Sequence, residues 1–172
     1  MPLSRVRKLD SSTEQTKDGG TLYSPIPSLF MNKKIKIIIG LGQKRKHYHS
    51  LSKHLNIREV DWNNGSLSKM RLGRPKILIG FSLGCMVAIM HAEKYRVKTL
   101  ILCSPSPEET LLRVKADQVI FLVGEKENWC LKEIKRMSRT LKCRYSIIVI
   151  RGANHRITGD YQKKLVEVIQ SL

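Results

Sequence analysis

The five residues Gly80-Phe81-Ser82-Leu83-Gly84 constrain the fold of this chain more than any other feature. They follow a short apolar run, Lys76–Ile79, that is typical of a buried strand, and they precede Cys85–Ala92, which is rich in helix-forming residues. A strand, a tight turn with serine at its apex and a helix together form a nucleophile elbow. Glycine fits on both sides of the turn because side chains there would collide with the neighbouring strand and helix. The pattern therefore predicts that the hydroxyl of Ser82 projects above a sheet from a strained backbone.

Two later strand-like runs also end in polar loops. Gln118–Val123 leads into Gly124–Asn128, and Ser146–Ile150 leads into Arg151–His155. In open parallel α/β sheets, the carboxyl ends of the strands meet at one edge, and ligand chemistry occurs there. We therefore expect both loops to lie at the same edge of the sheet as Ser82.

These loops carry the groups that serine chemistry needs. A serine hydroxyl is a poor nucleophile and requires a base that takes its proton. The base needs a carboxylate that fixes its tautomer and stabilises the imidazolium. Ser82, Glu127 and His155 supply the three groups in the order expected after an elbow: serine, acid, histidine. Glu125, in the same loop as Glu127, is the alternative acid.

With these motifs the sequence resembles the α/β-hydrolase family. The resemblance is carried by the elbow, Val97–Pro105, Leu122–Glu127 and Gly152–His155, and it extends over roughly residues 31–172. It is similar to the small members with a minimal cap domain or none. The resemblance implies a single-domain α/β fold of about six parallel strands with helices on both faces. It also implies the strand order second, first, elbow strand, then the remaining three, with an open and shallow site.

An oxyanion hole is expected beside Ser82. One donor would be the backbone N–H of Leu83, the residue after the nucleophile. The second would come from the loop after the first strand, where Leu41 or Gly42 is the expected donor. Each such donor stabilises the charge that develops on the carbonyl oxygen, typically by about 3–4 kcal/mol.

The remaining elements follow from the alternation of apolar runs and helix-forming segments. Further strands are expected at Ile35–Ile39, Ile57–Trp62 and Val97–Cys103. Helices are expected at His47–Leu55, Trp129–Leu141 and Gly159–Leu172, with another helix beginning at Ser106–Glu109. Surface or packing roles are expected for His47, His49, His54 and His91, which lie on or beside the helices.

The chain is strongly basic, with 32 Lys and Arg against 14 Asp and Glu, a net charge of +18 and a pI near 10.1. Such a charge attracts polyanions and anionic surfaces. Because the basic residues are scattered along the whole chain, we favour a general basic bias over a dedicated surface for nucleic acid or an anionic membrane. The run Gln43–Lys46 follows the expected oxyanion loop and could steer an anionic substrate such as a CoA thioester or a phospholipid.

The cysteines and the N-terminal segment indicate the compartment. Cys85, Cys103, Cys130 and Cys143 form neither a C-x-x-C pair nor a zinc-like spacing, so we expect reduced thiols in a cytoplasmic protein. The N-terminal segment lacks the apolar core of a signal peptide. Residues 1–30 are polar and are predicted to form a flexible or extended tail before a domain at 31–172. Met31 is an alternative first residue.

From these observations we expect a serine hydrolase of carboxylic esters or acyl thioesters. Ser82 would form the acyl-enzyme, His155 would act as the base and Glu127 would orient it, and we expect the reaction to need no cofactor and no metal. Two alternatives stay open. One is an acyltransferase that uses the same three residues. The other is a non-catalytic anion- or nucleic-acid-binding protein with the same fold.

Overall fold

A computed structural model describes residues 34–52, 55–62, 70–106 and 113–172. The predicted tail at 1–30, residues 63–69 between the second strand and the elbow strand, and residues 107–112 of the helix predicted to begin at Ser106–Glu109 lie outside these residues.

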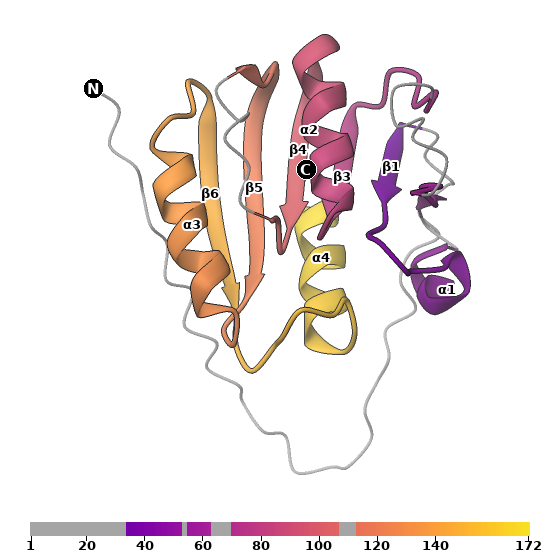
Figure 1. Cartoon of the computed structure of the whole chain (residues 1–172), viewed down its shortest axis with the longest axis vertical. Helices are drawn as coiled ribbons and strands as arrows, with labels where there is room; N and C mark the ends of the chain where they lie inside the picture. Colours follow the sequence, from indigo (N-terminus) through magenta and orange to yellow (C-terminus); the bar gives the residue numbers. More distant parts are fainter. Residues whose placement is uncertain (1–33, 53–54, 63–69, 107–112) are drawn as a thin grey trace.

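The centre of the molecule is a six-stranded parallel sheet (Figure 1). Its strands are β1 (Ile35–Ile38), β2 (Asn56–Arg58), β3 (Ile77–Phe81), β4 (Val97–Cys103), β5 (Ala116–Gly124) and β6 (Arg144–Ile150). They are arranged in the order β2-β1-β3-β4-β5-β6, and every neighbouring pair is parallel. The predicted fold class and strand order are both confirmed.

Helices cover both faces of the sheet. The helices α2 (Gly84–Lys94) and α3 (Asn128–Ser138) pack on one face and lie in front of the strands in Figure 1. The other face is covered by α1 (His49–Ser52), which follows the short 3-10 helix η1 (Arg45–Tyr48), and by α4 (Asp160–Gln170). The expected helices on both faces are confirmed.

Alternate residues of each strand enter different layers of the core. In β3, Leu78 packs toward α2 and α3 while Ile79 packs toward α4, and both are fully buried. A parallel sheet covered on both faces requires such nearly continuous apolar strands. The helix α4 adds one apolar stripe, formed by Tyr161, Leu165, Val168 and Ile169.

Several elements begin or end at other residues than the sequence predicts. The second strand ends at Arg58 rather than Trp62 because it lies at the edge and pairs only with the four-residue β1. The predicted helix His47–Leu55 begins instead as the 3-10 turn η1, and its described α-helical part is α1 at His49–Ser52, followed by a hydrogen bond from the Leu55 N–H to the Leu51 carbonyl at 2.9 Å. The helix α3 ends at Ser138, where the hydroxyls of Ser138 and Thr140 donate to backbone carbonyls of its last turn.

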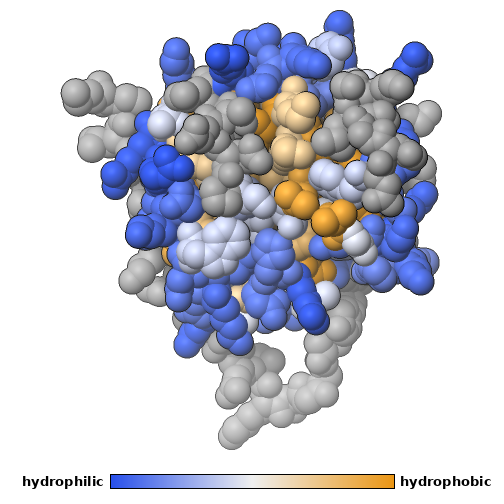
Figure 2. Space-filling model, in the orientation of Figure 1, coloured by the Kyte–Doolittle hydropathy of each residue, from blue (hydrophilic) through white to orange (hydrophobic). Residues whose placement is uncertain are grey.

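The surface of the α2 and α3 face is mostly hydrophilic around a central apolar patch (Figure 2). On α3 the side chains of Cys130, Ile134 and Met137 are buried, whereas the lysines and arginines between them face solvent. Among the described residues, none of the helices is long and apolar enough to cross a membrane.

Candidate functional site

Ser82 occupies the turn between β3 and α2. Its φ of 53° lies in the left-handed region, which residues other than glycine adopt rarely. Two backbone hydrogen bonds hold the turn: the Ser82 N–H donates to the Cys103 carbonyl and the Cys85 N–H donates to the Ser82 carbonyl, each at 2.9 Å. This geometry places the half-buried Ser82 side chain at the carboxyl edge of the sheet.

Close packing requires glycine on both sides of Ser82. A β-carbon on Gly80 would lie 2.5 Å from the α-carbon of Cys85, and one on Gly84 would lie 2.9 Å from the carbonyl carbon of Ile38. Both neighbours are backbone atoms, which cannot move aside as the end of a flexible side chain can. The two elbow glycines therefore let α2 pack directly against β1 and β3.

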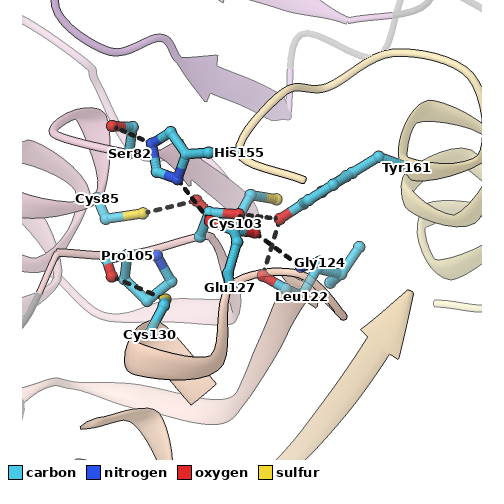
Figure 3. Close-up of polar contacts among 11 residues, drawn as sticks. Ser82, Cys85, Cys103, Pro105, Leu122, Gly124, Glu127, Cys130, His155 and Tyr161 are labelled. Carbon is cyan, nitrogen blue, oxygen red and sulfur yellow. Dashed lines mark hydrogen bonds and ion pairs between the residues drawn. The ribbon is translucent and has the colours of Figure 1, made fainter. Parts of the chain in front are cut away.

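His155 contacts both other candidate residues (Figure 3). Its Nε2 lies 2.9 Å from the Ser82 hydroxyl, and its Nδ1 lies 2.5 Å from Oε1 of Glu127. The three residues come from the β3–α2 turn, the β5–α3 loop and the β6–α4 loop, which all leave the carboxyl edge of the sheet. The His155 side chain is 42% exposed, so the serine–histidine pair is open to a ligand from solvent.

The second oxygen of the Glu127 carboxylate is also hydrogen-bonded. Oε2 accepts from the Ser104 hydroxyl at 2.7 Å and from the Gly124 N–H at 2.8 Å. Burial opposes the charge on this carboxyl and raises its pKa, but the hydrogen bonds from His155, Ser104 and Gly124 outweigh burial and hold the pKa of Glu127 below its ordinary value. Glu127 is therefore a carboxylate at neutral pH even though only 4% of its side chain is exposed.

The alternative acid, Glu125, points elsewhere. Its carboxylate accepts the Gly152 N–H at 2.8 Å, and its side chain is exposed. Glu125 thus ties the β5–α3 loop to the β6–α4 loop, and Glu127 is the glutamate that accepts a hydrogen bond from His155.

The segments expected to provide oxyanion donors both adjoin Ser82. The loop after β1 turns at Gly40–Gln43, with Gly42 at a φ of 71° and the Gln43 N–H donating to the Gly40 carbonyl. A β-carbon on Gly40 would lie 3.0 Å from the β-carbon of Ser82, so this loop runs directly against the serine. Leu41 is 60% exposed at its tip, and Leu83 is the residue directly before α2.

Depressions elsewhere on the surface are separate from this serine. A polar pocket of about 240 Å³ adjoins the loop that carries His155 and is lined by Arg151, Asn154 and Arg156 among others. Another, of about 690 Å³, lies at the opposite edge of the sheet beside the C-terminal end of α2. The basic residues Lys44, Arg45 and Lys46 are exposed just after the Gly40–Gln43 turn.

No protein-family model matches the chain, and no curated protein sequence matches it. Several solved structures, in contrast, match its fold. An esterase domain from Rhodothermus marinus has a TM-score of 0.63 at 10% identity, covering 86% of this chain and 88% of that one. A serine hydrolase without a lid, XC6422 from Xanthomonas campestris, has a TM-score of 0.55 at 16% identity, covering 86% and 82%.

The fold is that of the α/β-hydrolases. Dienelactone hydrolase from Anabaena variabilis shares it as well, with a TM-score of 0.57 at 11% identity over 80% of this chain and 84% of that one. At these identities the likeness shows a common fold.

Two polar residues of the site were missed by the sequence analysis. Ser104 directly follows β4 at the carboxyl edge, so the rule that singled out the other loops could also have found it. Tyr161 lies within α4 and is fully buried behind Ser104. Its position follows an ordinary apolar helical spacing, and nothing in that pattern distinguishes a polar role from a place in the core.

Proposed function

We propose that this protein is a serine hydrolase that cleaves carboxylic esters or acyl thioesters. The observation that carries the proposal is the position of His155, whose two ring nitrogens lie 2.9 Å from the Ser82 hydroxyl and 2.5 Å from Glu127. A nucleophile in contact with a base, and a base in contact with an orienting carboxylate, is the arrangement that activates a serine.

In the first half of the reaction, the Ser82 oxygen attacks the acyl carbonyl carbon while Nε2 of His155 takes the hydroxyl proton. The buried carboxylate of Glu127 stabilises the imidazolium. The negative oxygen of the tetrahedral intermediate accepts hydrogen bonds from the N–H of Leu83 and from Leu41 or Gly42. The bond to the leaving oxygen or sulfur then breaks, and the imidazolium gives its proton to that leaving group.

In the second half, a water molecule attacks the carbonyl carbon of the acyl-enzyme while Nε2 of His155 takes a proton from that water. The tetrahedral intermediate collapses to a free carboxylic acid, and the proton returns to the oxygen of Ser82. An alcohol or a thiol that replaces water would give acyl transfer through the same steps, so products should be analysed with and without such acceptors.

Hydrolysis of p-nitrophenyl esters and of acyl-CoA thioesters tests the proposal. Wild type should turn over at least one of these classes, and the Ser82→Ala and His155→Ala variants should each lose activity by at least about a thousandfold. His47→Ala is the matched control. His47 is an exposed histidine close to the Gly40–Gln43 turn, and its replacement should leave the rate of hydrolysis unchanged. Equal activity of wild type and Ser82→Ala would contradict the proposal.

A further inference from the structure

The carboxylate of Glu127 is held from behind by two buried hydroxyls. Ser104 donates to Oε2 of Glu127 at 2.7 Å, and the hydroxyl of Tyr161 lies 2.9 Å from that of Ser104. Neither Ser104 nor Tyr161 has any exposed surface. We propose that Ser104 and Tyr161 form a two-hydroxyl relay that fixes Glu127 as an ionised, oriented carboxylate. This inference deepens the proposed function and rests on it for its catalytic meaning.

Ser104 is held in place by its backbone. It adopts a φ of 46°, in the left-handed region, and its N–H donates to the Leu122 carbonyl at 2.8 Å. A non-glycine residue in this region is strained, and such strain persists only where the surroundings impose it. The strained turn after β4 aims the Ser104 hydroxyl at Glu127 instead of letting the chain continue away from the sheet.

The number of hydroxyl protons determines which group of the relay donates to which. The hydroxyls of Ser104 and Tyr161 each have one proton to donate, and three acceptors are within reach: Oε2 of Glu127, the Ser104 hydroxyl oxygen and the Leu122 carbonyl, 2.8 Å from the Tyr161 hydroxyl. An ionised carboxylate accepts only, so the proton of Ser104 goes to Glu127. The proton of Tyr161 is then shared between Ser104 and Leu122, and donation to Ser104 strengthens the bond to the carboxylate.

Tyr161 also supports the histidine through a ring contact. Its ring packs edge-on against Phe81 at 6.2 Å, and Phe81 in turn packs against the His155 ring at 5.4 Å. Tyr161 of α4 is therefore linked to Glu127 through Ser104 and to His155 through Phe81.

Three buried ionisable groups near Glu127 stay neutral around neutral pH. Burial raises the pKa of the Cys103 thiol on β4 and of the Tyr161 hydroxyl on α4, and it raises the pKa of Cys130 on α3 to about 12. None of these three groups therefore adds a charge beside Glu127 at neutral pH.

The test is a ¹³C NMR titration of the Glu127 carboxyl in the full chain, with the resonance assigned by Glu127→Gln. Loss of a hydrogen bond to a charged group should raise the pKa of Glu127 by about one unit in Ser104→Ala. Tyr161→Phe should raise it in the same direction by a smaller amount, and the double variant should match Ser104→Ala because the relay acts as a unit. Ser138→Ala removes a buried hydroxyl on α3 whose bond is to Lys135, and it should leave the titration unchanged.

Kinetics provide the second measurement. A positioning role predicts that Ser104→Ala lowers kcat about tenfold with KM unchanged, because the Glu127 contact matters when the imidazolium forms. Tyr161→Phe keeps the ring and its packing, so it reports on the hydroxyl even if Ser104→Ala does not fold.

The outcomes separate the two proposals. An unchanged Glu127 titration in both single variants overturns the relay, whatever the activity of the enzyme. If the pKa of Glu127 rises in Ser104→Ala but not in Tyr161→Phe, the part assigned to Tyr161 is overturned. Because the titration needs no substrate, a raised pKa in both variants of a protein that hydrolyses nothing would support the relay and overturn the proposed function.

Discussion

Gly84 lies against the backbone of Ile38, so that a β-carbon on the glycine would meet the Ile38 carbonyl carbon at 2.9 Å. This contact brings the first turn of α2 onto β1 and fixes where the elbow serine stands. The position of the nucleophile therefore depends on an absent side chain two residues away from it.

Gly84→Ala should destabilise the fold strongly, because the methyl group meets backbone that cannot yield. We expect a loss of about 3 kcal/mol in the free energy of unfolding, measured by urea denaturation. Gly152→Ala is the control: its φ is 68°, but no atom lies within 4 Å of its β-carbon position. It should cost about 1–2 kcal/mol from backbone strain alone. Equal costs at the two positions would show that α2 does not need this close approach.

Glu127→Gln should lower kcat by about three to four orders of magnitude while leaving the chain folded. The amide cannot stabilise an imidazolium, and it favours the wrong tautomer of His155. Glu125→Gln is the matched control, because the same change two residues earlier affects an exposed carboxylate whose partner is the Gly152 N–H. Steady-state kinetics should place Glu125→Gln within about threefold of wild type. A larger effect at Glu125 than at Glu127 would reverse the assignment of the acid.

The stability of the protein should fall in acid because of Glu127. Its pKa lies below the ordinary value of 4.5 in the folded state, so it contributes stability above that pH and the contribution is lost as the pH falls through the folded pKa. Thermal unfolding of wild type and Glu127→Gln at several pH values between about 6 and 3 measures this linkage. The difference between the two curves should shrink as the pH falls. A constant difference would mean that the carboxyl is not held ionised.

A second pH dependence should come from His91, on α2. Burial lowers the pKa of His91 below its ordinary 6.5, helped by the positive charge of Lys36. Folding therefore favours the neutral ring, and stability should decrease as the pH falls through 6.5, where the unfolded chain takes up the proton. His91→Gln should flatten the change in Tm between about pH 7.5 and 5.5, whereas His49→Gln, on the exposed surface, should not. The same slope in wild type and His91→Gln would contradict the assignment.

The fold could be predicted because several segments of the sequence indicate it independently. The strands β1 and β3 to β6 are apolar runs separated by helices, and Gly80 and Gly84 mark a turn that needs missing side chains. The strand β2 is shorter than predicted. Its length depends on its only neighbour in the sheet, β1, and the apolar pattern of one segment does not indicate the length of another.

The site could be predicted less completely. The chain order placed Ser82, His155 and two candidate glutamates at one edge, but the choice between Glu125 and Glu127 depends on how a short loop turns. This turn needs a glycine at position 124, because a β-carbon there would lie 2.6 Å from the Ala153 carbonyl oxygen and 2.9 Å from the Glu127 carboxylate. The role of Tyr161 depends on a contact across 57 residues with Ser104. Such a pairing is fixed by tertiary packing and leaves no local pattern.

The most direct test of an activated serine is labelling with a fluorophosphonate, followed by intact mass and peptide mapping. Wild type should take up one phosphonyl group per chain on Ser82, because the probe reacts with a serine whose proton a neighbouring base removes. Ser82→Ala and His155→Ala should take up none under the same conditions, while Ser138→Ala should label like wild type. Folded wild type that stays unlabelled, or that is labelled at another residue, would contradict the assignment of Ser82 as the nucleophile.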